Sequence, residues 1–161
     1  MSAQPPPVGP LSARSDHACF GCGDRNPIGL HLQFVSDGVG VTATFVPMAE
    51  HQGFHDVVHG GIISTVLDEA MAWAVAAAGI WAVPGEMSIR FRRPLPVGAM
   101  TTATARVTTI RGRLIEATGE LVDAVDGAIY ASSTGKFITV DRATATDWES
   151  RYRAPEAAAT D

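Results

Sequence analysis

The stretch His51–Gly79, HQGFHDVVHGGIISTVLDEAMAWAVAAAG, opens with a polar loop and passes through His59-Gly60-Gly61 into the longest helical pattern of the chain. Its apolar residues recur at the spacing of an α-helix; they are Ile62, Ile63, Val66, Leu67, Ala70, Met71 and Ala74. The opposite face is also apolar or small, and a helix that is apolar nearly all round is buried on nearly all sides. In a chain otherwise rich in strand patterns, this predicts a central helix wrapped by a sheet.

Two polar features of this helix point to chemistry. Gly60 and Gly61 have no Cβ, so a ligand can approach their backbone closely. The first N–H groups of a helix have no intrahelical partner and lie at the positive end of its dipole, which suits an anion or a developing oxyanion. The second feature is Asp68, because a carboxylate on an apolar helix costs several kcal/mol unless it is paired or functional. Glu69 lies about 100° further round the helix and is predicted to be structural.

The motif His59-Gly60-Gly61, six further residues and then Asp68 in the context LDEAM resembles the hotdog-fold thioesterases of the PaaI-like (4HBT) superfamily. Three further stretches fit the same family in the same order: CFGCGDRNPIGL, HQG and MSIRFRRPLPVG. The likeness extends from about Cys19 to Val140. The four stretches together are characteristic of the superfamily but not of any one substrate.

The resemblance implies an α+β hotdog fold, in which a curved antiparallel sheet wraps around one long central helix. It implies an acyl-CoA thioesterase whose site lies between two subunits of a homodimer or homotetramer, with coenzyme A as part of the substrate and no other cofactor. Asp68 then acts as general base or as nucleophile, and the backbone N–H groups of Gly60 and Gly61 serve as oxyanion donors. His59 is expected to shape the loop, and Gln52 to hydrogen-bond the substrate or the loop.

One position departs from the family pattern. Related enzymes often carry a Ser or Thr at the start of the strand after the helix, where it positions water, but Pro84 stands at that place here. Ser88 is the nearest hydroxyl, and Glu86 is an alternative. A non-catalytic acyl-CoA-binding or sensing protein of the same fold is therefore the second hypothesis. A hydratase or dehydratase is the third, although the helix carries no histidine after His59.

Three arginines follow in the next strand pattern. Arg90 and Arg92 share one face and Arg93 the other. Guanidinium groups bind phosphates well, so all three are candidates to bind the phosphates of coenzyme A. The alternative is a solvated strand edge whose charges discourage aggregation.

The organisation along the chain is predicted from strand and turn patterns. Residues 1–16 are expected to be disordered, 17–140 to form the hotdog domain, and 141–161 to be a tail that includes a short helix. A hairpin around Asp37-Gly38 joins strands 30–36 and 39–46. After the helix, Pro84-Gly85 turns the chain. Strands are then expected at 86–94, 100–110, 113–125 and 128–140.

The composition narrows the partners and the compartment. The net charge of −5 favours neither nucleic acid nor an anionic membrane as a binding partner. No apolar run is expected to span a membrane, and the N-terminus lacks the apolar core of a signal peptide, so a cytoplasmic protein is expected.

Metal ligation is not predicted. Cys19 and Cys22 form one CxxC motif without a second, and they fit a turn with two buried thiols better than a metal site. The histidines His51, His55 and His59 fit a polar loop better than a metal site.

Overall fold

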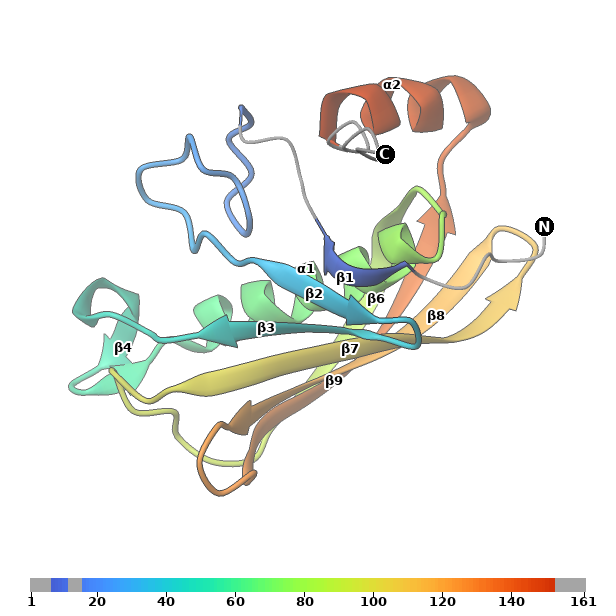
Figure 1. Ribbon diagram of the computed structural model, residues 1–161. Coiled ribbons are helices and arrows are strands. Elements are labelled where there is room, and N and C mark those ends of the chain that lie inside the picture. Colours follow the sequence, from blue (N-terminus) through green and yellow to red (C-terminus); the bar gives the residue numbers. More distant parts are fainter. Residues whose placement is uncertain (1–6, 12–15, 153–161) are drawn as a thin grey trace.

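The computed structural model describes residues 7–11 and 16–152, which form an antiparallel sheet curved around one long helix (Figure 1). The sheet has seven strands in the order β1-β2-β3-β7-β8-β9-β6. These strands are β1 (Val8–Leu11), β2 (Phe34–Asp37), β3 (Val41–Phe45), β6 (Ala82–Phe91), β7 (Thr101–Arg111), β8 (Leu114–Asp123) and β9 (Ile129–Thr139). The other elements are η1 (Ala49–His51), β4 (Gln52–Phe54), β5 (Val57–Val58), α1 (Gly60–Ala77) and α2 (Arg142–Tyr152). The predicted α+β hotdog architecture is confirmed.

The core lies between α1 and the inner face of the sheet. Leu67 and Met71 of α1 are fully buried, as is Phe137 of β9. The sheet carries glycines beneath Met71, and a Cβ on Gly135 would lie 3.1 Å from Met71 Cε, while one on Gly119 would lie 3.4 Å from Met71 Cγ. Glycine at these two positions therefore lets a large side chain of the helix approach the strands closely.

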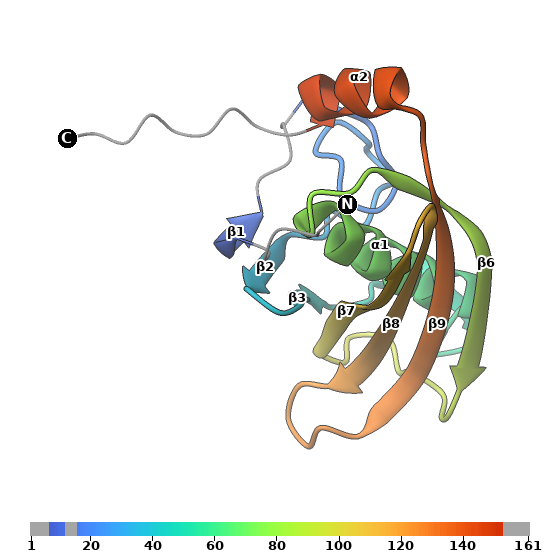
Figure 2. The same cartoon turned by 90° about the vertical axis from the view of Figure 1, so that its right-hand side faces the viewer.

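The central helix also corrects one expectation. By length and apolar composition α1 is able to cross a membrane, although no run of that kind was predicted. In this fold the apolar side chains of α1 pack against β7, β8, β6 and β3. Figure 2 shows the sheet curling around α1 and the loop 16–33 lying between α1 and α2. The apolar composition of α1 therefore fits a helix in the core of this domain.

The predicted hairpin around Asp37-Gly38 is present. Asp37 Oδ1 accepts hydrogen bonds from the N–H groups of Val39 and Gly40 at 2.8 and 2.7 Å, and Gly38 adopts φ +87°. A positive φ is costly for residues with a Cβ, so glycine suits this turn. The strands are shorter than expected, because residues 30–33 belong to the preceding loop.

The turn predicted at Pro84-Gly85 is wrong. The chain reverses at Gly79, which has φ +75°, and β6 begins at Ala82. Pro84 and Gly85 lie within β6, where the pairing with β9 shifts register between Pro84 and Glu86. A bulge on an edge strand accommodates a residue without an N–H group.

Both chain ends contain more structure than a disordered tail. Residues 8–11, within the segment 1–16 expected to be disordered, form β1 and pair with β2. Without β1, β2 would present an unpaired edge, and Pro10 is tolerated there because β1 is itself an edge strand. The predicted C-terminal helix is α2, whose start is capped by Asp141. The remaining residues of the two predicted tails, 1–6, 12–15 and 153–161, lie outside the described part of the chain.

Candidate active site

His59 organises the start of α1. It is the N-cap residue with extended backbone angles, and its Nδ1 accepts a hydrogen bond of 2.9 Å from the N–H of Gly61. The carbonyl of His59 accepts the N–H of Ile62 at 3.0 Å, which begins the helical ladder. The imidazole is thus engaged in capping the helix.

The two predicted oxyanion donors differ in availability. The Gly61 N–H is already donated to His59, whereas the Gly60 N–H has no hydrogen-bond partner within residues 7–11 and 16–152. Of the two predicted donors, Gly60 therefore presents the uncommitted N–H at the positive end of the helix dipole, and the oxyanion role of the pair stays a prediction. Phe91, the last residue of β6, lies beside this site, since a Cβ on Gly60 would be 3.4 Å from Phe91 Cζ.

Gln52 lies next to the start of the helix. It begins β4, and the preceding residue His51 accepts the His59 N–H at 2.8 Å through its carbonyl, which holds this ribbon against the cap. Gln52 Oε1 accepts the N–H of Asp56 at 3.2 Å. The donor end of the exposed Gln52 amide therefore points to no partner within the described chain and is free for a ligand.

The three neighbouring histidines do not converge. His51 is buried and its Nδ1 accepts the Met48 N–H at 3.0 Å, His55 is exposed beside Asp56, and His59 caps the helix. Among the described residues these histidines form no group that a metal ion would bind. Their positions fit the predicted polar loop.

The Asp68 carboxylate has no hydrogen-bond partner among the described residues. Its side chain is half-buried, and Oδ1 is buried with no hydrogen-bond partner in the described structure. Burial raises the pKa of Asp68, and the charge of the adjacent Glu69 raises it further. The hydroxyls one turn earlier are committed to the backbone, because Ser64 donates to Gly60 O and Thr65 donates to Gly61 O. A half-buried carboxylate with a raised pKa is suited to general-base or nucleophilic chemistry.

The strand β6 leaves the site open on one side. It is an edge strand, and Val83, Met87 and Phe91 on it are 41%, 36% and 52% exposed. Ser88 lies on the opposite face from Ile89, which packs on the core, so its hydroxyl points away from α1. Pro84 brings no hydroxyl either. The described chain therefore offers no hydroxyl of β6 beside Asp68 at the two positions that the family pattern suggested.

The three predicted phosphate-binding arginines separate into two groups. Arg90 and Arg92 line a groove of about 610 Å³ on the face of the sheet away from α1. Arg106 of β7 lines it too, and the sequence did not indicate this residue, because only strand register brings it there. Asp37 and Glu120 also line the groove, so three cationic and two acidic side chains surround it.

Arg93 is committed to the fold. Its guanidinium lies 4.2 Å from the centroid of the Tyr130 ring and donates to the carbonyl of Ala128 at 3.1 Å. Asp126 adds an ion pair at 3.6 Å. Arg93 thus holds the β8–β9 turn, and its predicted phosphate contact, which stays a prediction, would compete with these interactions.

A second group of ionisable side chains lies on the other side of α1. Sγ of Cys19, Sγ of Cys22 and a carboxylate oxygen of Glu69 all lie within 4.8 Å of one another, and all three residues are half-buried. The hydrogen bond from Cys22 and the backbone N–H groups of Cys22 and Gly21 lower the pKa of Cys19 to about 5. Burial, and then the charge of Cys19, raise the pKa of Glu69 to about 7. His17, whose Nδ1 accepts the Cys19 N–H at 3.3 Å, is not part of this group.

Comparison with known proteins identifies what the chain is similar to. A family model described as the thioesterase superfamily matches residues 55–130. Acyl-coenzyme A thioesterase THEM4 of Mus musculus is 24% identical over 90 residues, which cover 56% of this chain and 39% of that protein. The match thus spans about two-fifths of the length of this curated relative.

Two solved structures share the fold. A thioesterase superfamily protein, RHA08564, is 29% identical with a TM-score of 0.70, and the match covers 74% of this chain and 59% of that one. The E. coli PaaI protein of the phenylacetic acid degradation operon is 26% identical with a TM-score of 0.65, and the match covers 70% of this chain and 81% of that one.

Proposed function

The chain belongs to the hotdog-fold thioesterase superfamily, and we propose that it hydrolyses an acyl-CoA thioester to the free acid and coenzyme A. The observation that carries this proposal is that α1 presents both a half-buried Asp68 carboxylate and a Gly60 N–H, each without a hydrogen-bond partner among the described residues. The name of the curated mouse relative supports acyl-CoA as the class of substrate. The reaction uses coenzyme A as part of the substrate and calls for no further cofactor.

Each group has a place in thioester hydrolysis. The Gly60 N–H, aided by the helix dipole and by the Gln52 amide, stabilises the negative charge that develops on the carbonyl oxygen. Asp68 either removes a proton from the attacking water or attacks the carbonyl carbon directly. The bond between carbonyl carbon and sulfur then breaks and coenzyme A leaves as a thiol. His59 positions the first turn of α1 through its bond to Gly61.

One chain does not bring these groups to the same carbonyl. Gly60 and Asp68 are eight residues apart on one helix, which corresponds to about 12 Å along its axis. A reacting carbonyl must lie within about 3 Å of both its oxyanion donor and its nucleophile. We therefore assign Gly60 of one subunit and Asp68 of another to each active site, in a homodimer or in a tetramer built from two dimers.

The strand β6 is suited to this dimer. Its outer edge has no strand partner within the described residues, and it carries the exposed apolar side chains of Val83, Met87 and Phe91. Edge-to-edge pairing of two β6 strands would extend the sheet and remove an exposed edge. Phe91 lies beside Gly60, so this pairing would bring a second chain to the start of α1.

The test is thiol release from short-, medium-, long-chain and aryl-CoA esters by the wild type and by Asp68→Asn. We expect Asp68→Asn to lower kcat by about 10²–10⁴-fold with an unchanged oligomeric state, because it removes the base or nucleophile and keeps the side-chain shape. Asp147→Asn, which removes an exposed carboxylate of α2, is the matched control and should retain full activity. Hydrolysis by Asp68→Asn at the wild-type rate would exclude the assigned role. Binding of CoA esters without thiol release by the wild type would favour the acyl-CoA-binding hypothesis.

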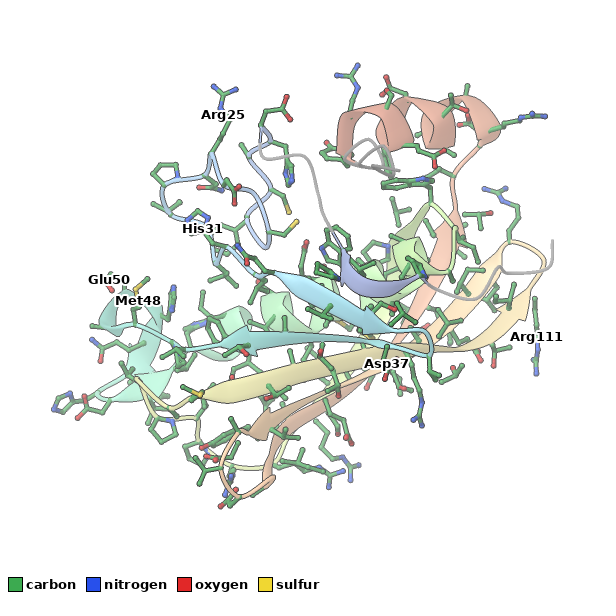
Figure 3. All side chains as sticks on the ribbon, viewed as in Figure 1. Arg25, His31, Asp37, Met48, Glu50 and Arg111 are labelled. Atoms are coloured by element: carbon green, nitrogen blue, oxygen red, sulfur yellow. The ribbon has the colours of Figure 1, made fainter. Side chains whose placement is uncertain are left out.

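The phosphate-binding role is tested separately with Arg90→Ala. We expect it to raise KM for CoA esters about tenfold while leaving KM for pantetheine thioesters, which lack the nucleotide, unchanged. Arg111→Ala is the control of equal charge, because Arg111, which projects at the end of the sheet opposite Met48 and Glu50 (Figure 3), does not line the groove. An equal rise in KM for both classes of thioester would exclude a phosphate contact by Arg90.

A further inference from the structure

We propose that Cys19, Cys22 and Glu69 form a zinc-binding site that ties the loop 16–33 to α1. The proposed hydrolysis uses none of these three groups. Glu69 follows Asp68 in sequence but points to another side of the helix, toward the loop that carries both cysteines. The site is therefore separate from the thioesterase site.

The spacing of the donor atoms matches a tetrahedral zinc ion. Cys19 Sγ lies 3.7 and 3.8 Å from the two carboxylate oxygens of Glu69, and the Cys22 sulfur lies within the same 4.8 Å group. Zinc binds sulfur at about 2.3 Å and carboxylate oxygen at about 2.0 Å, so at the tetrahedral angle a sulfur and an oxygen ligand are about 3.5 Å apart. The distances between Cys19 Sγ and the Glu69 oxygens are thus within a few tenths of an ångström of the spacing that zinc requires.

The surroundings position these ligands. A Cβ on Gly21 would overlap the Glu69 carboxylate, so glycine between the cysteines allows the loop to close onto the helix. The N–H of Gly23 donates to the carbonyl of Cys19 at 3.0 Å and closes the turn of the CxxC motif. Trp73 Nε1 donates to Glu69 Oε1 at 3.1 Å, which orients the carboxylate as an outer-shell partner orients a metal ligand.

The group lacks positive charge. Two thiols and a carboxylate crowd a half-buried space, and within the described chain no lysine or arginine forms an ion pair with Glu69. Arg25, the cation of the same loop, points outward from the molecule (Figure 3). Buried charges in proteins are paired or bind a metal ion, so a divalent cation supplies what the side chains lack.

The donor set selects the metal. Thiolate ligands favour zinc over calcium or magnesium, which prefer oxygen. Three protein ligands leave one tetrahedral position, and the partial exposure of all three residues lets water fill it. A disulfide between Cys19 and Cys22 would be the alternative use of the two thiols, but it would leave Glu69 buried without a cation.

The test is metal binding by the whole chain, purified without added metal and reduced. We expect one zinc ion per chain by mass spectrometry and, after cobalt(II) substitution, the near-ultraviolet absorption of thiolate-to-cobalt charge transfer together with visible tetrahedral bands. Cys19→Ser, Cys22→Ser and Glu69→Gln should each weaken zinc affinity by more than about 100-fold, since loss of an outer-shell partner alone costs 10- to 100-fold. Asp68→Asn, which changes the adjacent carboxylate in the same way, should bind zinc as the wild type does.

The outcomes decide between the alternatives without reference to catalysis. Stoichiometric zinc binding that Glu69→Gln lacks and Asp68→Asn keeps supports the site. Wild-type affinity in Glu69→Gln overturns it, because the carboxylate is then no ligand. Absence of zinc binding with two freely reactive thiols, or formation of a disulfide in the presence of equimolar zinc, also overturns it. Thiol release from CoA esters can succeed or fail independently of each result.

Discussion

Asp68 and Glu69 are consecutive carboxylates on α1, yet the two sides of the helix that they face differ in their surroundings. On the Glu69 side the loop 16–33 covers the helix, and Glu69 has partners in Trp73 and Cys19. On the Asp68 side no partner reaches the carboxylate within the described residues, and the adjoining strand β6 is exposed. We call these the covered side and the open side.

The comparison teaches that the covering segment determines the use of a carboxylate on this helix. Both groups have raised pKa values for the same first reason, which is burial. The loop surrounds Glu69 with sulfur ligands and a hydrogen-bond donor, so its chemistry is that of a binding site. On the open side Asp68 has no such partner among the described residues, and we propose that a second subunit completes its active site.

The largest effect is expected from removing the Gly60 N–H, the hydrogen-bond donor that we assign to the open side. Gly60→Pro deletes the N–H, and proline fits the first helical position after the extended His59. We expect kcat to fall by about 10²–10³-fold, the usual loss for an oxyanion donor, measured as thiol release from the best CoA ester.

Gly60→Ala is the control for this change, since it adds a Cβ beside Phe91 and retains the N–H. It should keep most of the activity. If alanine and proline reduce kcat equally, the loss comes from crowding against Phe91 and the N–H has no role.

Mixing two inactive variants tests whether each active site is shared between two subunits. In a dimer of one Asp68→Asn chain and one Gly60→Pro chain, one site combines the intact Asp68 with the intact Gly60. Random pairing makes half of the dimers hybrid with one of two sites intact, so the co-expressed mixture should recover about a quarter of wild-type activity and the isolated hybrid about half. The measurement is thiol release by hybrids isolated through two affinity tags. Recovery no greater than the sum of the two parents would show that each site belongs to one chain.

The covered side is tested by Gly21→Ala, for which we expect the smallest effect. The new Cβ overlaps Glu69 and pushes the loop from α1, which should lower the free energy of unfolding by about 1–3 kcal/mol. Urea denaturation followed by tryptophan fluorescence measures the change. Gly53→Ala, whose Cβ would lie 3.0 Å from the His59 ring on the open side, provides the comparison. A stability of Gly21→Ala equal to that of the wild type would mean that the loop does not pack on Glu69 in solution.

Local patterns were sufficient for α1 and for the strands β2, β3 and β6 to β9. The helical spacing of Leu67 and Met71, and the turn chemistry of Asp37-Gly38, predicted α1 and the β2–β3 hairpin. The turn predicted at Pro84-Gly85 was wrong, because this dipeptide, which is typical of turns, lies here in a bulge of the edge strand β6. The strand at residues 8–11 was missed because its stability comes from pairing with β2, which its own composition does not indicate.

The sequence by itself determined which functional groups are present. These are a glycine pair at the start of a helix, a carboxylate two turns later, a CxxC motif and a run of arginines. Only the tertiary structure decided how these groups are used, because hydrogen bonds and burial depend on residues distant in the chain. It assigned the Gly61 N–H to His59, stacked Arg93 on Tyr130 and placed Arg106 in the groove that Arg90 also lines. It also joined Cys19 to Glu69 across 50 positions of sequence, since a loop and a helix meet only when the sheet has folded around α1.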